Sequence, residues 1–168
     1  MRRRTGKAVR CSNVSTEDVI SVSCANNKYY RYKAQGAMKN EKGNPDRCQF
    51  FNVAQDDILG NEAPHANPKP VQDNRETFLS FLRNARCIIE LILEIIDAKL
   101  GLIKGTLASL QRQDRPSGSV IRMTRYSPWS PTEQNSGSAL VNHTDYGTIT
   151  MLCNILGGLQ ILPPGKSS

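Results

Sequence analysis

The sequence predicts an α+β protein in which a helical region comes first and a run of short strands follows. Residues 74–100 carry apolar side chains at alternating spacings of three and four, which is the period of an amphipathic helix. From Gly118 onward the apolar period changes to two, which is typical of half-buried strands. Helices followed by a block of strands suit an α+β arrangement with an all-β core. The length of 168 residues corresponds to about one domain.

The helix predicted over residues 74–100 has clear start and stop signals. Asp73 or Asn74 can cap its start, and Gly101 stands where a helix-ending glycine is expected. Further apolar residues widen its hydrophobic surface beyond one stripe: Leu79, Phe81, Ile88, Leu91, Leu93 and Ile95. We therefore expect this helix to be buried on more than one side, against a sheet or another helix. A short helix is expected to follow over residues 106–112.

Short strands are predicted both before and after these helices. Residues 48–53 form one inside an irregular, Pro-rich region, and Asp56-Asp57 after it opens a helical turn. Residues 120–126 alternate well enough for a strand. Further strands are expected at about 139–144, 147–153 and 158–163, with Gly157-Gly158 as the last turn. Cys153 in this pattern is expected to be a small buried side chain.

The net charge of +7 comes wholly from the N-terminal third of the chain. Residues 1–47 hold 11 Lys and Arg against 4 Asp and Glu, whereas residues 48–168 hold 11 of each. A nucleic-acid interface needs basic residues on an ordered face with aromatic platforms. The Arg2-Arg3-Arg4 cluster lies far in sequence from Tyr29, Tyr30 and Tyr32. A solvated, partly disordered segment explains the charge better, and residues 1–28 are assigned no fold.

Cysteine usage and hydropathy favour a cytoplasmic protein without membrane or nucleic-acid partners. The five cysteines are odd in number, widely spread and without a C-x-x-C pair, which argues against a disulfide framework and a zinc site. No apolar run approaches the ~20 residues of a membrane span. The N-terminus lacks the apolar core of a secretory signal, and Glu17 and Asp18 weaken a mitochondrial presequence. The sequence does not indicate an oligomeric state.

The segment from Asn142 to Gly147, NHTDYG, carries the most informative chemistry. A strand sends residues i and i+2 to the same face, so His143 and Asp145 would stand side by side. An imidazole and a carboxylate are two of the three ligands of a 2-His-1-carboxylate iron site, which leaves an open face for a co-substrate and O₂. Gly147 is expected to let the chain bend near the metal.

The pair needs a third ligand, and the pattern alone is weak. H-x-D occurs by chance in many proteins, where it is ordinary polar surface. The one other histidine, His65, lies in a Pro-rich loop, and we favour an exposed loop residue over a ligand there. Thr148 and Thr150, which follow the pair, have hydroxyls suited to hydrogen bonding.

The run from Ala139 to Leu152, ALVNHTDYGTITML, followed by GLQIL at 158–162, resembles the iron(II)/2-oxoglutarate-dependent dioxygenases of the isopenicillin N synthase-like class. The pattern of that class is H-T-D-x-G-x-x-T-x-L, a short spacer and G-L-Q-V. The segment RMTRYSP at 122–128 resembles the strand ahead of it, and the helix at 74–100 with L-G-L at 100–102 matches the preceding elements. The resemblance covers roughly residues 29–168.

The resemblance implies a double-stranded β-helix (jelly-roll) oxygenase that binds Fe(II) through H-x-D and a distant second histidine. With O₂, and in most members 2-oxoglutarate as co-substrate, such enzymes hydroxylate, desaturate or cyclise a small organic substrate. By match, His143 and Asp145 carry over as iron ligands and Tyr126 as a residue lining the co-substrate pocket. The implied organisation is an unassigned basic segment 1–28, a helical support region 29–115 and the N-terminal part of the jelly roll, 116–168.

The sequence also departs from the family pattern. It stops just after G-L-Q-I-L-P-P, before the strands that would carry the second histidine and an R-x-S arginine. We therefore expect a partial jelly roll, incomplete at the C-terminus, in a truncated enzyme that is inactive alone. Two alternatives stay open. One is a non-catalytic jelly-roll remnant that acts by interaction or has no function, and the other is a nucleic-acid binder driven by residues 1–47.

Overall fold

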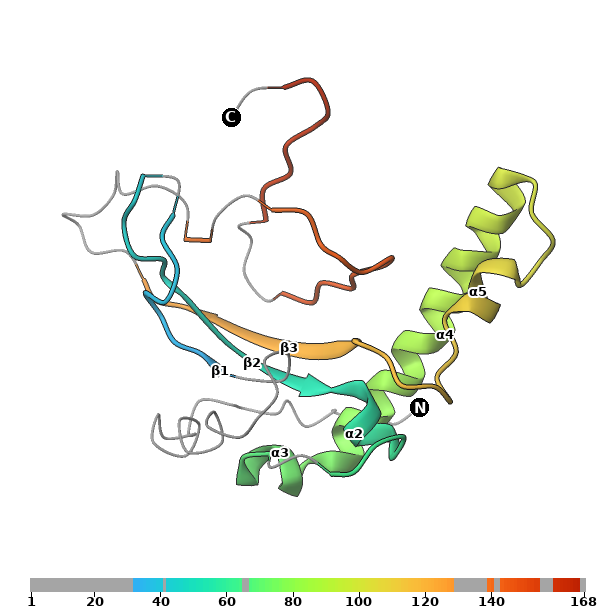
Figure 1. The fold of residues 1–168 in the computed structure, drawn as a ribbon, viewed down its shortest axis with the longest axis horizontal. Helices are drawn as coiled ribbons and strands as arrows, with labels where there is room; N and C mark the ends of the chain where they lie inside the picture. Colours follow the sequence, from blue (N-terminus) through green and yellow to red (C-terminus); the bar gives the residue numbers. More distant parts are fainter. Residues whose placement is uncertain are drawn as a thin grey trace, which may run out of the picture.

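The structure is a computed structural model that describes residues 32–40, 42–64, 67–128, 139–140, 143–154 and 159–166. Its elements, in chain order, are β1 (Tyr32–Lys33), β2 (Cys48–Ala54), α2 (Gln55–Leu59), α3 (Lys69–Asp73), α4 (Arg75–Leu100), α5 (Thr106–Leu110) and β3 (Val120–Tyr126). In Figure 1, α2 and α3 lie on one side of a small sheet, and the chain after residue 143 lies on the other. This mixture of helices with one antiparallel sheet is compatible with the predicted α+β class, whereas the jelly roll stays a prediction.

The sheet has three antiparallel strands in the order β1-β2-β3. The central strand β2 pairs with β3 over its full length, from Cys48 opposite Tyr126 to Ala54 opposite Val120. The strands predicted at 48–53 and 120–126 are therefore confirmed. Because β2 and β3 are far apart in sequence, this pairing joins the region before the helices to the region after them.

The hydrophobic core lies between one face of this sheet and the start of α4. Period-two alternation points Val53 of β2 toward α4, where Phe78 and Leu82 meet it one turn apart. Ile58 and Val71 complete the buried cluster, and four partly buried neighbours from the sheet and α2 pack around it: Phe51, Leu59, Ile121 and Met123. The buried face of β2 and the buried face of α4 thus form one core, as the strand and helix patterns of the sequence predict.

The long helix begins and ends as predicted, and its C-terminus shows why. Gly101 adopts the left-handed conformation with φ of 69°, which only glycine adopts without strain. Asn74 is the N-cap residue, but its side chain donates to the Pro70 carbonyl oxygen at 2.8 Å instead of capping α4. The short helix predicted at 106–112 is confirmed as α5, which ends at Leu110.

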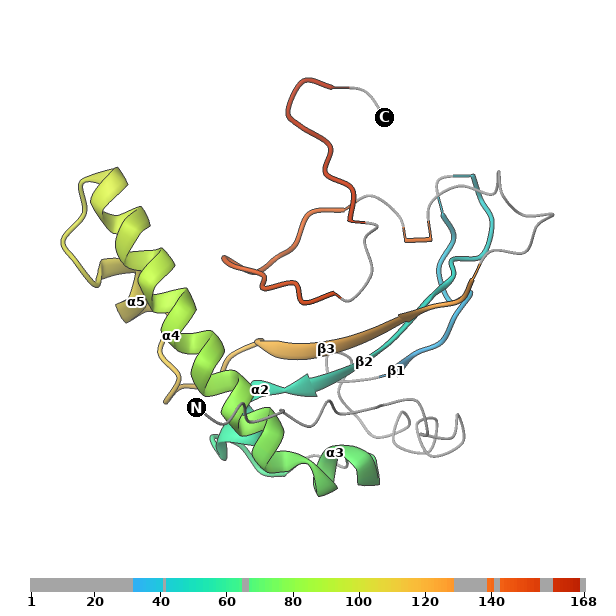
Figure 2. The same ribbon diagram turned by 180° about the vertical axis from the view of Figure 1, so that it is seen from behind.

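The expectation that α4 is buried on more than one side is wrong for the described structure. Its core-facing residues are buried, but a second apolar stripe is exposed, formed by Phe81, Ile88, Leu91 and Ile95. We call these four residues the α4 stripe. Figure 2 shows α4 rising away from the sheet, with α5 packed along its far half. No described element covers the α4 stripe, which is why its apolar side chains meet solvent.

The strands predicted after residue 138 are also wrong where the structure describes them: residues 139–140, 143–154 and 159–163 form no strand. A strand needs a neighbour to pair its backbone N–H and C=O groups. β3 is an edge strand of the described sheet, but no described residue of the later segment pairs with its open edge. The later apolar residues are accordingly exposed, as at Leu152 and Ile161, and so is Cys153, which was expected to be buried.

Across the part of the chain that the structure describes, no helix is both long enough and apolar enough to cross a bilayer.

Candidate metal site

The predicted ligand pair lies in a segment outside the sheet. His143, Thr144 and Asp145 have no strand structure, and a bend follows at residues 146–148. The strand on which the prediction rested is therefore wrong, but the two side chains still meet. His143 Nε2 lies 3.5 Å from Asp145 Oδ1, and the two side chains are 47% and 49% exposed. The two side chains thus face each other and remain open to solvent.

A hydrogen bond holds the Asp145 carboxylate from the other side of the bend. Thr150 Oγ1 donates to Asp145 Oδ2 at 2.5 Å, so the two carboxylate oxygens have different neighbours. The hydrogen-bonding role expected of this threonine is confirmed. The expected bend is also present. A Cβ atom added at Gly147 would meet no atom within 4 Å, so crowding does not require a glycine at this position.

The donor atoms of the pair suit a divalent transition metal. Two ligands bound at about 2.1 Å and at right angles lie about 3.0 Å apart. The 3.5 Å between His143 Nε2 and Asp145 Oδ1 is close to that separation, and a small side-chain rotation would close the difference. The residues present therefore fit two adjacent positions of an iron site. Among the described residues, no group of three or more His, Cys, Asp or Glu forms a complete metal cluster.

Tyr126, the predicted co-substrate residue, is placed at the end of β3, opposite Cys48 of β2. Its ring is half exposed. Burial raises the pKa of the Tyr126 hydroxyl, and contact with the Cys48 thiol raises it further, so the phenol keeps its proton at neutral pH. Burial also raises the pKa of Cys48, which makes that thiol a poor nucleophile. Tyr126 thus contacts Cys48 across the pairing of β2 with β3.

The segment that carries the pair is tied to the same end of the sheet. The backbone N–H of Arg47, just before β2, donates to the Ala139 carbonyl oxygen at 3.1 Å. The Arg47 side chain donates to the Ser127 carbonyl oxygen, directly after Tyr126. His65, the other histidine considered in the sequence, lies outside the described residues.

Sequence reasoning missed a set of buried carboxylates. Asp56 and Asp57 were interpreted as charge at a helix start, yet both are almost fully buried. Asp56 accepts a hydrogen bond from the Asn61 amide at 3.1 Å and one from the Ser117 backbone N–H at 2.6 Å. Asp56 therefore joins α2 to the chain just before β3. No local pattern indicates a partner 61 positions away in the sequence.

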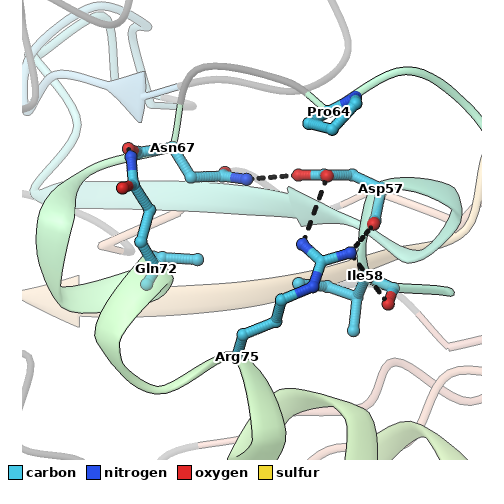
Figure 3. A pocket seen from close by; sticks show the side chains of 7 residues that line it. Asp57, Ile58, Pro64, Asn67, Gln72 and Arg75 are labelled. Carbon is cyan, nitrogen blue, oxygen red and sulfur yellow. Dashed lines mark hydrogen bonds and ion pairs between the residues drawn. The ribbon is translucent and has the colours of Figure 1, made fainter. Parts of the chain in front are cut away.

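Asp57 borders a cavity of about 330 Å³ between α2, α3 and the start of α4 (Figure 3). The Arg75 guanidinium and the Asn67 amide both point at its carboxylate, and the Gln72 amide donates to the Asn67 carbonyl oxygen at 2.5 Å. Arg75 also donates to the carbonyl oxygens of Asp57 and Ile58. Since the buried carboxylate is already paired, we interpret this network as structural and not as a binding site.

Asp46 is a further buried carboxylate, held inside the turn that precedes β2. Burial by itself would raise its pKa, but a hydrogen bond and ion pair with Lys33 and backbone N–H groups of Gly36 and Met38 outweigh burial. The pKa of Asp46 therefore lies below its usual value. The folded state is stabilised by the ionised group.

This lowered pKa predicts an acid-sensitive contribution to stability. The contribution is fully present above the unfolded-state pKa of about 3.9 and is lost as the pH falls through the lower folded-state value. Asp46→Asn should lower the free energy of unfolding at pH 7 and weaken its dependence on pH below about 4. Urea unfolding at pH 7 and at several acid pH values measures both effects. Asp73→Asn removes an exposed carboxylate that is paired with Lys69, and it is the control for the loss of stability at pH 7.

These observations define a helix-and-sheet protein whose exposed H-x-D pair fits two ligand positions of a metal site, and comparison with curated proteins supports the 2-oxoglutarate-dependent dioxygenase family. The chain is 29% identical over 133 residues, 78% of its length, to the 2-oxoglutarate-dependent dioxygenase ecdG of Aspergillus rugulosus. It is 23% identical over 177 aligned positions, 96% of its length, to a 2-oxoglutarate-dependent dioxygenase of Aspergillus fumigatus.

The matches cover only part of each relative. The chain spans 38% of the first protein and 46% of the second. No protein-family profile matches the chain. No solved structure matches it significantly either.

Proposed function

We propose that this protein is an Fe(II)- and 2-oxoglutarate-dependent oxidoreductase of the isopenicillin N synthase-like class. It would hydroxylate, desaturate or cyclise a small organic molecule with O₂. The observation that carries the proposal is the approach of His143 Nε2 to Asp145 Oδ1, at 3.5 Å, within the motif that most resembles this class. The two curated relatives named as 2-oxoglutarate-dependent dioxygenases support it independently.

In this proposal His143 and Asp145 hold the iron through Nε2 and Oδ1. Bound Fe(II) supplies the activation of O₂ that is coupled to decarboxylation of 2-oxoglutarate. The half-exposed pair leaves room for these small molecules to approach. The protonated hydroxyl of Tyr126, at the end of β3, is a hydrogen-bond donor for the co-substrate.

We also propose that His143 and Asp145 supply two of the three protein ligands of a 2-His-1-carboxylate iron site, so that these two residues alone hold the metal weakly. Two protein ligands hold a metal less tightly than three, because each ligand contributes its own bond. The proposal includes a cytoplasmic location, which rests on the number and spacing of the cysteines in the sequence.

Anaerobic spectroscopy tests the iron site directly. The wild-type chain, titrated with Fe(II) to saturation in the presence of 2-oxoglutarate, should develop a visible charge-transfer band. His143→Ala should abolish the band, because the variant keeps one of the two ligands. His65→Ala is the matched control, since it removes the one other histidine, and it should keep the band. A wild-type chain without the band at saturating Fe(II) would contradict the proposal.

The exposed α4 stripe favours a second candidate, a non-catalytic remnant that acts by interaction. Four apolar side chains that meet solvent along one helix are typical of a contact surface. The same experiment separates the two functions. Absence of the band from the wild-type chain favours the interaction fragment, whereas a band that depends on His143 favours the oxidoreductase.

A further inference from the structure

We propose that Thr150 is a positioning residue that selects which oxygen of Asp145 faces the metal. The inference rests on the proposed function of the His143–Asp145 pair. It concerns a residue that binds no metal itself and acts through the Asp145 carboxylate.

The two oxygens of the Asp145 carboxylate have different neighbours. Thr150 Oγ1 donates to Asp145 Oδ2 at 2.5 Å. Oδ1, the other oxygen, lies 3.5 Å from His143 Nε2. The hydrogen bond therefore engages the oxygen that points away from the imidazole and leaves the facing oxygen to serve as the ligand.

This division matters because Asp145 is half exposed and lies in a segment without secondary structure. An aspartate in such a place has several rotamers, and ordering it on metal binding costs conformational entropy. The Thr150 hydroxyl fixes the carboxylate before the metal arrives. Outer partners of this kind typically change metal affinity by 10–100-fold when they are removed.

The bond also sets the shape of the segment. It spans five residues, from the second ligand across the bend at residues 146–148. Threonine is well suited to this task because its branched Cβ restricts the side chain to few rotamers. The neighbouring Thr148 is exposed as well but makes no hydrogen bond to Asp145, so the chain provides its own control.

Metal titration of the full chain tests the inference. Dissociation constants for Fe(II) alone would be measured anaerobically by isothermal titration calorimetry. Thr150→Val keeps the shape of the side chain without its hydroxyl, and it should weaken Fe(II) binding by about 10-fold or more. Thr150→Ser restores the hydroxyl and should restore the affinity. Thr148→Val should bind as the wild type does, and circular dichroism verifies that all variants are equally folded.

Three results would overturn the inference, and they differ in what they imply for the proposed function. If Thr150→Val binds like the wild type while His143→Ala loses binding, Thr150 has no positioning role and the proposed metal site stands. If Thr148→Val and Thr150→Val are weakened equally, the effect is general damage to the segment. If the wild-type chain binds no Fe(II), the proposed function fails together with the inference.

Discussion

Phe78→Ala should lower the free energy of unfolding by about 3–5 kcal/mol, the largest single effect that we expect in this protein. Phe78 is only 6% exposed and packs with Val53, Ile58, Val71 and Leu82 where the sheet meets α4. Truncation removes a large buried side chain and leaves a cavity that the surrounding strand and helix cannot fill. Urea unfolding followed by circular dichroism at 222 nm measures the change.

Phe81→Ala is the matched control for this prediction. Phe81 lies three residues further along α4 in the α4 stripe and is 40% exposed, so the same truncation should cost much less. Equal losses for the two variants would show that the exposed stripe is covered in solution. That result would contradict the arrangement of α4 described above.

Asp97→Ala should lower the free energy of unfolding by about 3 kcal/mol, because two backbone donors lose their acceptor. Asp97 is completely buried on α4. It accepts hydrogen bonds from the backbone N–H of Gly105 at 2.9 Å and of Leu107 at 3.1 Å. The carboxylate thus caps the start of α5 from the neighbouring helix and holds the two helices together.

Two further variants make this prediction specific. Asp97→Asn keeps one oxygen acceptor and turns the other position into a donor, so its loss should lie between wild type and Asp97→Ala. Asp73→Ala removes an exposed carboxylate from an ion pair with Lys69 and should cost less than about 1 kcal/mol. Thermal unfolding of the four proteins ranks them. An Asp97→Ala protein as stable as Asp73→Ala would exclude the capping role.

The elements that the sequence predicts well are those with a strong local period. The helix at α4 has more than twenty residues of regular spacing and a glycine at its end, and its bounds agree with the structure within one residue. β2 and β3, of seven residues each, were also found. β1 has only two residues and was missed. α3 was missed because Pro70, which lies in its first turn, was taken as a sign of irregular structure.

The elements predicted wrongly depend on partners that a local pattern does not contain. Residues 147–153 alternate as a strand does, but alternation stabilises a strand only where a neighbouring strand pairs with it. The burial of the aspartates was not predicted, for the same reason. The partners of Asp56 and Asp97 include backbone N–H groups elsewhere in the chain. Nearly every residue type carries a backbone N–H group, so the sequence does not indicate which residue donates.

The candidate site was found from residue identity although the predicted backbone was wrong. A spacing of two between His143 and Asp145 allows their side chains to meet in the bent segment as it would in a strand. The motif therefore predicted the pair and not its surroundings. Thr150 was noted only for its hydroxyl, because its aim at Asp145 Oδ2 depends on the bend between them.

The pairing of β2 with β3 determines the order in which this chain can reach its final shape. All four helices of the described residues lie between the two strands, so the sheet closes around a loop that contains most of the described protein. Closing so long a loop is slow, whereas contacts between neighbours in sequence, such as α4 with α5, form fast. The pair of helices α4 and α5 is therefore expected to assemble first, and the sheet last. On the ribosome, Cys48 to Ala54 must wait for Val120 to Tyr126 to be synthesised before the pairing of β2 with β3 can form.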